Sequence, residues 1–287
     1  EIQRQQAVQN TIDAKVKAHQ ALTDSDIEFI CPVAFKEKMT KSEIKKLGLS
    51  KHYSFVPTSR VINDLRTMGW NPVDAVQVKA RKKETNGYQK HMITFENDSY
   101  KTEGATEYPQ LLLTNSHDGG NAFTLSAGIF RLVCSNGLVL KTEDYGTSRL
   151  VHKGYSFEAI QDLVNDFVAT IDETLTRITA MKEVELTKAQ QMEFAKAAAL
   201  LRFTEKSYNE QNISDVVDLD DLLSVERKED AGDGLWEVYN RVQESIVQGS
   251  FHYIGGNKKS RKARPIKNFK QSIDVNKKLS ELAFAYV

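Results

Sequence analysis

The hydrophobic pattern of this 287-residue chain changes from a period of two over residues 74–129 to a helical period after residue 156, and that change limits the folds it can adopt. Residues 74–96 alternate apolar and polar side chains around an Asn-Gly pair, which predicts an antiparallel β-hairpin. Residues 111–113 and 123–129 predict two further strands, and from residue 156 onward the apolar residues recur at helical spacing. We therefore expect an α+β fold, with an antiparallel sheet over about residues 74–140 packed with helices from the C-terminal half.

Capping residues locate several of the predicted helices. Thr58 or Ser59 can accept a free backbone N–H and begin a helix, which Gly69 then ends in a left-handed conformation. Ser156 can begin a second helix, whose apolar spacing continues to Ile178. Three more helices are expected: one from Thr187, with Gln190 completing a capping box, one from Asp233 to Gly249, and one near residues 271–286.

These elements suggest three segments. Residues 1–50 are expected to form an N-terminal helical arm and an irregular segment, because their helical periodicity is weak. Residues 51–150 hold the sheet-containing core, and residues 151–287 form a helical part with a basic segment, packed on the core as one domain. The N-terminal helix also suits an oligomer contact, so we expect a homo-oligomer.

The composition is ordinary for a globular protein. No apolar run reaches the roughly 18 residues that a membrane-spanning helix needs, so no membrane partner is expected. Cys31 and Cys134 each stand among apolar residues and have no CxxC partner, which predicts two buried, reduced thiols. We expect a cytoplasmic protein.

The stretch from Thr114 to Leu140 carries the residues that most resemble a catalytic loop. His117 and Asp118 are adjacent, so they cannot chelate one metal or form a Ser-His-Asp arrangement with Ser116. Nucleotide-binding glycine loops, a GxSxG elbow and an HExxH motif are absent. We interpret Asp118-Gly119-Gly120 and Ser135-Asn136-Gly137 as turns, whose amides can also hold a phosphate. We predict no catalytic residue, metal or cofactor, and no enzyme.

Three stretches together resemble a known family. They are FVPTSRVINDLRTMGWNPV at 55–73, LTNSHDGGNAFTLSAGIFRLVCSNGLVL at 113–140 and LWEVYNRVQESIVQG at 235–249, followed by a Lys/Arg-rich stretch. Over about residues 28–287 the chain is similar to the phage/plasmid-like family of unknown function, found in phages, prophages and conjugative plasmids. The resemblance implies no catalytic residues, and it implies DNA handling or the countering of host defence. A sheet-plus-helix domain with a basic ribbon is also loosely similar to single-strand-annealing recombination proteins.

The formal charge is zero, with 39 basic and 39 acidic residues, but the charges are unevenly placed. Residues 257–278 hold nine basic residues and one acidic residue. Residues 205–237 hold eleven acidic residues and three basic ones. Separated blocks of opposite sign indicate an anionic partner for one block and shielding or self-association for the other.

The leading hypothesis is a nucleic-acid-binding protein, with single-stranded DNA favoured, that binds or anneals strands in phage or plasmid recombination or replication. Pro265 excludes one continuous helix through the basic block, which predicts an extended arm or loop that follows a phosphate backbone. Phe251, Tyr253 and Phe269 are candidates to stack on bases. The predicted contacts are Lys258, Lys259, Arg261, Lys262, Arg264, Lys267 and Lys270 from the arm, and Lys79, Arg81, Lys83 and Lys90 from the 74–96 hairpin.

Other interpretations stay open. The basic block can be a solvated surface or an intramolecular partner of the acidic block. The protein can be an oligomeric protein–protein effector, such as an inhibitor of a host anti-phage defence system, and an enzyme ranks third. Asn240, Gln243 and Glu244 share one helical face, which usually means exposure to solvent and otherwise a buried network that orients the basic segment.

Overall fold

The computed structural model describes residues 2–50, 53–80, 82–101, 107–120, 123–131, 148–150, 156–203 and 212–287. The fold is α+β, as predicted. The chain divides into two compact units, which we call the sheet unit (Glu1–Gly128 with Tyr145–Val168) and the helical unit (Ile129–Asp144 with Ala169–Val287). The expectation that residues 151–287 pack on the sheet as one domain stays a prediction.

The sheet has five strands in the order of the sequence: β1 (Asn71–Gln77), β2 (His91–Glu96), β3 (Glu107–Asn115), β4 (Phe123–Arg131) and β5 (Ser148–Leu150). β1 with β2, β2 with β3 and β4 with β5 pair antiparallel. The predicted hairpin is therefore present, but its strands are shorter than expected. Residues 78–90 form a long connection that contains the 3₁₀ turn η2 (Lys83–Thr85).

Alternation over residues 74–81 predicts that Val76, Val78 and Ala80 form the apolar face of the first strand, and this prediction is wrong. Ala75 lies opposite Ile93 and is buried, together with Val73, whereas Val76 and Val78 are each 39% exposed. β1 carries apolar residues on both faces, so alternation alone does not decide which face packs. The larger side chains of the partner strand β2 decide it, because directly opposite residues share a face.

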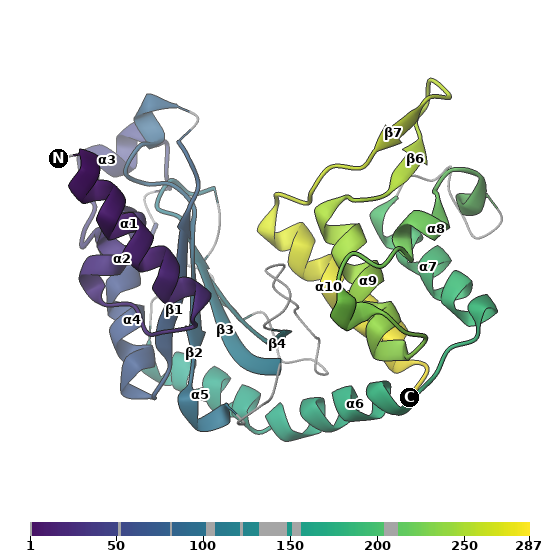
Figure 1. Cartoon of the computed structure of the whole chain (residues 1–287). Coiled ribbons are helices and arrows are strands. Elements are labelled where there is room, and N and C mark those ends of the chain that lie inside the picture. The colour runs from purple at the N-terminus through teal and green to yellow at the C-terminus, as the bar shows by residue number, and fades with distance from the viewer. Residues whose placement is uncertain are drawn as a thin grey trace. The chain divides into compact units, whose positions relative to one another are not determined.

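Helices cover one side of the sheet in Figure 1: α1 (Ile2–Lys17), α2 (Asp24–Ile30) and α4 (Thr58–Thr67) all contact β1. α1 buries Ile12, and most of its other residues are exposed. Gly69 follows α4 with φ +83°, as expected. The N-cap of α4 is Pro57, not Thr58 or Ser59, because Thr58 is already helical and buried. The remaining elements of this unit are η1 (Pro32–Phe35), α3 (Lys41–Lys46), η3 (Asp98–Tyr100) and α5 (Phe157–Val168).

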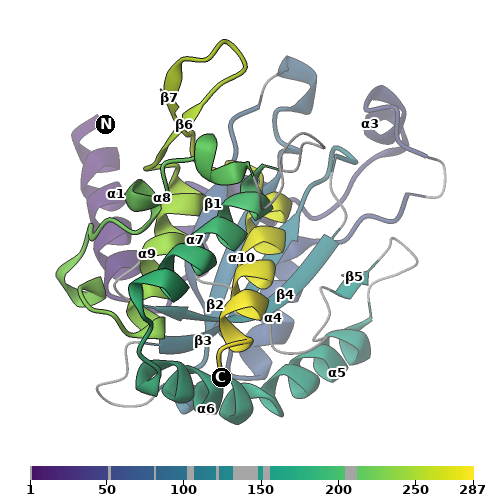
Figure 2. The same cartoon turned by 90° about the vertical axis from the view of Figure 1, so that its right-hand side faces the viewer.

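The helical unit is built around α9 (Leu235–Gln248). α9 contacts α6 (Ile171–Glu183), α7 (Lys188–Arg202), α8 (Leu219–Leu222) and α10 (Phe269–Phe284), and Figures 1 and 2 show α9 and α10 running beside α7. The core of this unit includes Phe194, Trp236, Tyr239, Phe251 and Leu279. The unit also contains η4 (Ile213–Asp215), η5 (Lys228–Asp230), β6 (His252–Ile254) and β7 (Ser260–Lys262).

Two helix boundaries differ from the sequence prediction. The single helix expected from 157 to 178 stops at Val168 and restarts at Ile171, and the two units divide at this break. Gly234, not Asp233, is the N-cap of α9, because the Asp233 carboxylate accepts hydrogen bonds from Lys188 and Gln191 instead. The capping boxes and caps expected at Thr187 and Ser156 are present.

Cys31 is a buried free thiol, as predicted, and burial raises its pKa to about 12. Cys134 and the Ser135-Asn136-Gly137 turn lie outside the described residues. Among the helices that the structure describes, none combines the length and the apolar character that crossing a membrane requires.

Candidate nucleic-acid interface

The first part of the predicted basic arm is a β-hairpin that follows α9. β6 and β7 pair antiparallel with Tyr253 opposite Arg261, and the Gly255 N–H donates to the Lys259 carbonyl at 3.0 Å across the turn. Lys258 takes φ +57°, which a short turn beginning with two glycines and an asparagine accommodates. We call residues 252–262 the basic hairpin. In Figures 1 and 2 it extends beyond the helices of its own unit.

The residues after the hairpin, 263–267, form a strap that is fixed along the end of α9. The Ala263 N–H donates to the Phe251 carbonyl and the Ile266 N–H donates to the Val247 carbonyl, both at 2.8 Å. The Arg202 guanidinium donates to the Arg264 carbonyl. The strap is therefore held by backbone hydrogen bonds while its long basic side chains stay exposed.

One edge of the hairpin is paired and the other is open. The Ile254 N–H donates to the Val216 carbonyl at 2.7 Å, and the Asp218 N–H donates to the His252 carbonyl at 3.0 Å, so β6 is paired on both sides. No other described strand pairs with the outer edge of β7. By the alternation of the ladder, the peptide groups of Ser260 and Lys262 face outward at that edge.

The basic side chains of the hairpin and strap are not neutralised by described residues. All six are exposed, and within the described ranges none has a carboxylate within 4 Å: Lys258, Lys259, Arg261, Lys262, Arg264 and Lys267. The described acidic block finds other partners. Asp233 pairs with Lys188, and Asp221 contacts the imidazole of His252 at 2.6 Å. Among the described residues no ion pair joins these six cations to the acidic block, although Asp218 and Asp221 of that block contact β6 of the same hairpin.

The aromatic residues near the hairpin do not all stay available for stacking. Phe251 is fully buried in the core, so the expectation that it stacks on a base is wrong. Tyr253 is half-buried, with its ring centroid 5.1 Å from that of Phe203. Phe269 and Lys270 begin α10, but their side chains lie outside the described residues. Ile254, which sequence reasoning did not single out, is 40% exposed on the hairpin.

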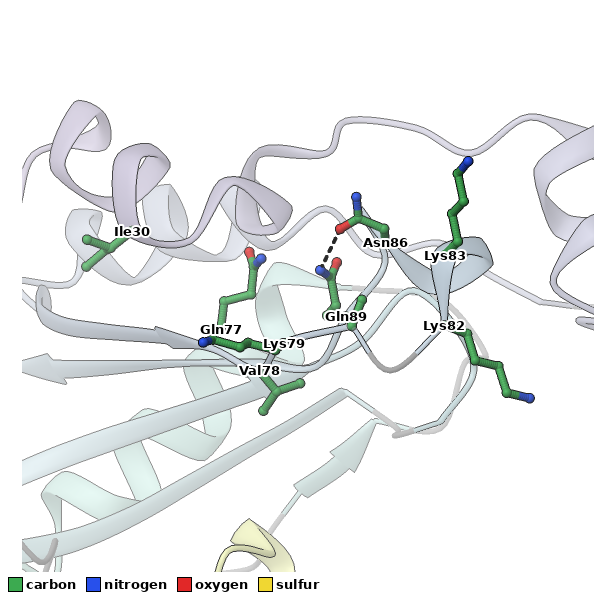
Figure 3. A pocket seen from close by; sticks show the side chains of 9 residues that line it. Ile30, Gln77, Val78, Lys79, Lys82, Lys83, Asn86 and Gln89 are labelled. Atoms are coloured by element: carbon green, nitrogen blue, oxygen red, sulfur yellow. Dashed lines mark hydrogen bonds between the residues drawn. The ribbon is translucent and has the colours of Figure 1, made fainter. Parts of the chain in front are cut away.

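The other predicted basic contacts lie in the sheet unit. Lys79 and Lys83 are exposed, and both line a hollow beside the 78–90 connection (Figure 3). Lys90 is half-buried, and this burial lowers its pKa. Arg81 lies outside the described residues. The structure thus separates the predicted contacts into a set in the helical unit and a set in the sheet unit.

The His117-Asp118 turn has a structural role. The Asp118 carboxylate accepts the Gly120 N–H at 2.9 Å, and Gly119 takes φ +77°, as the turn interpretation predicts. His117 is fully buried, with its ring centroid 5.3 Å from that of His91. Burial first, and then the nearby His91, lower the pKa of His117 to about 3. Among the described residues, no three His, Cys, Asp or Glu side chains gather closely enough to hold a metal ion.

The polar face of α9 is buried, so the interpretation of Asn240, Gln243 and Glu244 as solvent-exposed is wrong. The Gln243 side-chain amide donates to the Asn276 side-chain oxygen on α10 at 2.8 Å, and both residues are fully buried. The Asn240 amide donates to the Trp236 carbonyl at 2.6 Å. Glu244 accepts two hydrogen bonds from the Arg227 guanidinium, at 2.7 and 2.8 Å. Each of these side chains makes at least one hydrogen bond, but among the described residues Asn240 Oδ1 and Gln243 Oε1 are buried without a partner.

Residues 48–280 match the family model described as "Domain of unknown function (DUF932)". The chain belongs to the DUF932 family. Two Escherichia coli K12 proteins are similar to it over most of their length. UPF0380 protein YafZ is 27% identical over 272 residues, which cover 94% of this chain and 93% of YafZ. UPF0380 protein YfjQ is 28% identical over 234 residues, which cover 82% of this chain and 80% of YfjQ. No solved structure matches the chain.

Membership of a family of unknown function, as expected from the sequence, is thus confirmed, whereas the association of that family with phages and plasmids stays a prediction. The DUF932 match contains the basic hairpin, the strap and the whole of α9, and it leaves α1 and α2 outside. Sequence reasoning offered the buried network on α9 only as the less favoured alternative. The signal was present, because the 14 residues of α9 contain one arginine and no lysine, which is unusual for a helix with a solvated face.

Proposed function

We propose that this DUF932 protein binds nucleic acid through the basic hairpin and the strap. The observation that supports this proposal is the set of six exposed cations that have no ion-pair partner among the described residues. Like charges held on two short strands and a fixed strap repel one another. A phosphate backbone relieves that repulsion and gains free energy through the release of its counterions.

Single-stranded DNA is the favoured ligand. Ile254 places an exposed apolar side chain within the cationic hairpin, and Tyr253 is half-buried beside it. Unpaired bases offer flat apolar faces to such side chains, whereas a duplex stacks those faces on one another. We extend the proposal to the binding or annealing of strands in the cytoplasm, during recombination or replication of a phage or plasmid. The resemblance to families of mobile elements supports this setting, and no catalytic role is proposed.

A titration with a fluorescent single-stranded oligonucleotide tests the proposal. If the hairpin and strap neutralise about five phosphates, the logarithm of affinity should fall with the logarithm of salt at a slope near −4. The Lys258/Lys259/Arg261/Lys262/Arg264→Ala variant should lose at least about tenfold in affinity at 50 mM salt and most of this slope. Duplex DNA and single-stranded RNA, titrated in parallel, establish which nucleic acid is preferred.

A matched control variant distinguishes an effect of the basic hairpin from an effect of the net charge of the protein. The Lys17/Lys38/Lys41/Lys45/Lys46→Ala variant removes five exposed lysines from the sheet unit and gives the same net charge. It should bind like the wild type. Equal affinity of the two variants would refute a specific role for the hairpin.

A protein–protein effector is the second candidate, and the open outer edge of β7 favours it. An exposed strand edge can pair with a strand from another chain, either a second copy or a partner protein. An inhibitor of a host anti-phage defence system would act in this way. A discrete oligomer in gel filtration, unchanged by DNA and without any DNA-dependent mobility shift, would support this candidate over nucleic-acid binding.

A further inference from the structure

A hollow of about 460 Å³ lies in the sheet unit, where β1 ends and the 78–90 connection begins. It is separate from the basic hairpin and is formed by other elements. Ile30 at the end of α2 lines it on one side, and Gln77, Asn86 and Gln89 line its polar part (Figure 3). In Figure 3 these three amides stand on the same side of the chain, whereas Val78 points to the opposite side.

Hydrogen bonds to the main chain fix which way each amide is turned. The Val33 N–H donates to one side-chain atom of Gln77 at 3.1 Å, and since a main-chain N–H only donates, that atom is the oxygen. The Gly87 N–H likewise donates to the Gln89 side-chain oxygen at 2.6 Å. The Gln89 amide nitrogen must then donate, and its acceptor at 3.0 Å is the Asn86 oxygen.

All three amide oxygens are therefore occupied. The NH₂ groups of Gln77 and Asn86 remain as donors, and neither has a hydrogen-bond partner among the described residues. Lys79, Lys82 and Lys83 are exposed around the same hollow, and none of the described residues that line it is acidic. The open polar groups of the described lining side chains are thus hydrogen-bond donors and positive charges, which is the chemistry that recognises an oxyanion.

We propose that this hollow binds a phosphate group. Its volume is in the range of sites for small organic ligands, so it also has room for the nucleoside attached to that phosphate. The phosphate can belong to a free nucleotide or to a nucleotide of a single strand, and the donors would be the same for both. The proposal does not depend on nucleic-acid binding by the basic hairpin, because no residue is shared between the two sites.

The test exchanges a donor for an acceptor without changing the shape of the side chain. In Gln77→Glu, one carboxylate oxygen still accepts the Val33 N–H, and the other replaces the NH₂ group that faces the hollow. Asn86→Asp does the same at the second amide. Gln20→Glu adds the same charge at an exposed position of the sheet unit that does not line the hollow, and serves as the matched control.

The probes are inorganic phosphate, thymidine monophosphate, thymidine and a (dT)₁₀ oligonucleotide, at constant ionic strength. Side-chain amide signals of Gln77 and Asn86, followed by NMR in the full-length wild type, should shift with phosphate and with thymidine monophosphate but not with thymidine. Gln77→Glu should weaken phosphate binding at least about tenfold, a change of about 1.4 kcal/mol, and Gln20→Glu should change it less than about twofold.

The outcomes also distinguish phosphate binding at the hollow from nucleic-acid binding at the basic hairpin. The five-site alanine variant of the hairpin should still bind phosphate at the hollow, even where it has lost the oligonucleotide. Tighter binding of thymidine monophosphate than of (dT)₁₀ would identify a free nucleotide as the ligand, and the reverse order a single strand. Unshifted amide signals with every probe, or equal phosphate affinity of Gln77→Glu and Gln20→Glu, would overturn the proposal.

Discussion

His117 is a buried base, and no described residue makes a hydrogen bond of ordinary geometry to either of its ring nitrogens. Its pKa is lowered from 6.5 to about 3, so between these values the unfolded chain binds a proton that the folded chain does not. Stability from this residue is complete above about pH 6.5 and is lost as the pH falls toward 3. We predict that the free energy of unfolding decreases with acidification by up to about 1.4 kcal/mol per pH unit from this histidine.

Urea denaturation at several pH values between 7.5 and 4.5 measures this slope. His117→Phe keeps a ring beside Phe55, whose centroid is 4.6 Å away, and should reduce the slope by about one proton. A smaller slope should remain, because burial also lowers the pKa of His91. A slope unchanged by His117→Phe would contradict the prediction.

Gly249 is the second residue with a sharply defined requirement. It takes φ +71°, and a Cβ there would lie 2.6 Å from the carbonyl carbon of Arg264, in the strap. Gly48 takes a similar φ of +65°, but a Cβ there would meet nothing within 4 Å. An alanine at either position would therefore have the conformational cost of a left-handed backbone, about 1 kcal/mol. Only at position 249 would its Cβ also clash with the backbone of another segment.

We predict that Gly249→Ala lowers the free energy of unfolding by at least about 2 kcal/mol more than Gly48→Ala, because the backbone of the strap must move. Chemical denaturation of both variants measures the difference. The strap supports the basic residues, so Gly249→Ala should also weaken oligonucleotide binding in conditions where it is still folded. Equal destabilisation by the two variants would show that the close approach of the strap is not required.

At the scale of elements, α9 and α10 are joined by a buried hydrogen bond between Gln243 and Asn276. Removing one partner leaves the other with an unsatisfied polar group, whereas removing both also removes that cost. Gln243→Ala and Asn276→Ala should each lower the free energy of unfolding by about 2–3 kcal/mol. The double variant should be less destabilised than the sum of the two by about 1 kcal/mol, as a double-mutant cycle of urea unfolding would measure.

Strict additivity in that cycle would mean that the two side chains do not interact. Gln6→Ala, at an exposed site whose side-chain bond to Asn10 lies on the surface of α1, is the control and should change stability by less than about 0.5 kcal/mol.

The type of most elements could be predicted from the sequence, because local signals determine it. The Thr187 capping box, Gly69 and Gly249 all have the predicted conformations. The packing could not be predicted in the same way. Ala75 is buried because of Ile93 in the neighbouring strand, and Gln243 is buried because α10 supplies a partner. A pattern in one segment does not contain these tertiary contacts.

The candidate sites show the same difference between local signals, which the sequence contains, and tertiary contacts, which it does not. The basic residues of the hairpin could be identified by composition alone, since a cluster of charge needs no tertiary information. Their arrangement on two paired strands could not, because β6 is held by the peptide groups of Val216 and Asp218, far away in the sequence. The amide donors of Gln77 and Asn86 gave no sequence signal, because the orientation of Gln77 depends on Val33.

For the whole molecule, the 39 positive and 39 negative charges cancel, so any attraction for a polyanion depends on where the charges lie. Asp215, Asp218 and Asp220 are exposed and line a hollow of about 420 Å³, which Ser260 of β7 also lines. These carboxylates lie next to the basic hairpin within the same unit. They should repel a phosphate backbone bound there and so limit the affinity that the cations provide.

We predict that the Asp215/Asp218/Asp220→Asn variant binds a single-stranded oligonucleotide about fivefold more tightly than the wild type at 50 mM salt. The gain should shrink toward zero near 500 mM salt, where the Debye length is only about 4 Å. The Asp218→Asn change should still allow α8 to be capped, because an asparagine retains the side-chain oxygen that accepts the Asp221 N–H. Glu183→Gln removes an exposed carboxylate at the end of α6 and should have no effect. Fluorescence anisotropy at both salt concentrations measures these affinities. Neutralising three neighbouring anions cannot weaken the attraction between the hairpin and a polyanion. An unchanged or weakened affinity at 50 mM salt would therefore place the bound strand away from the hairpin.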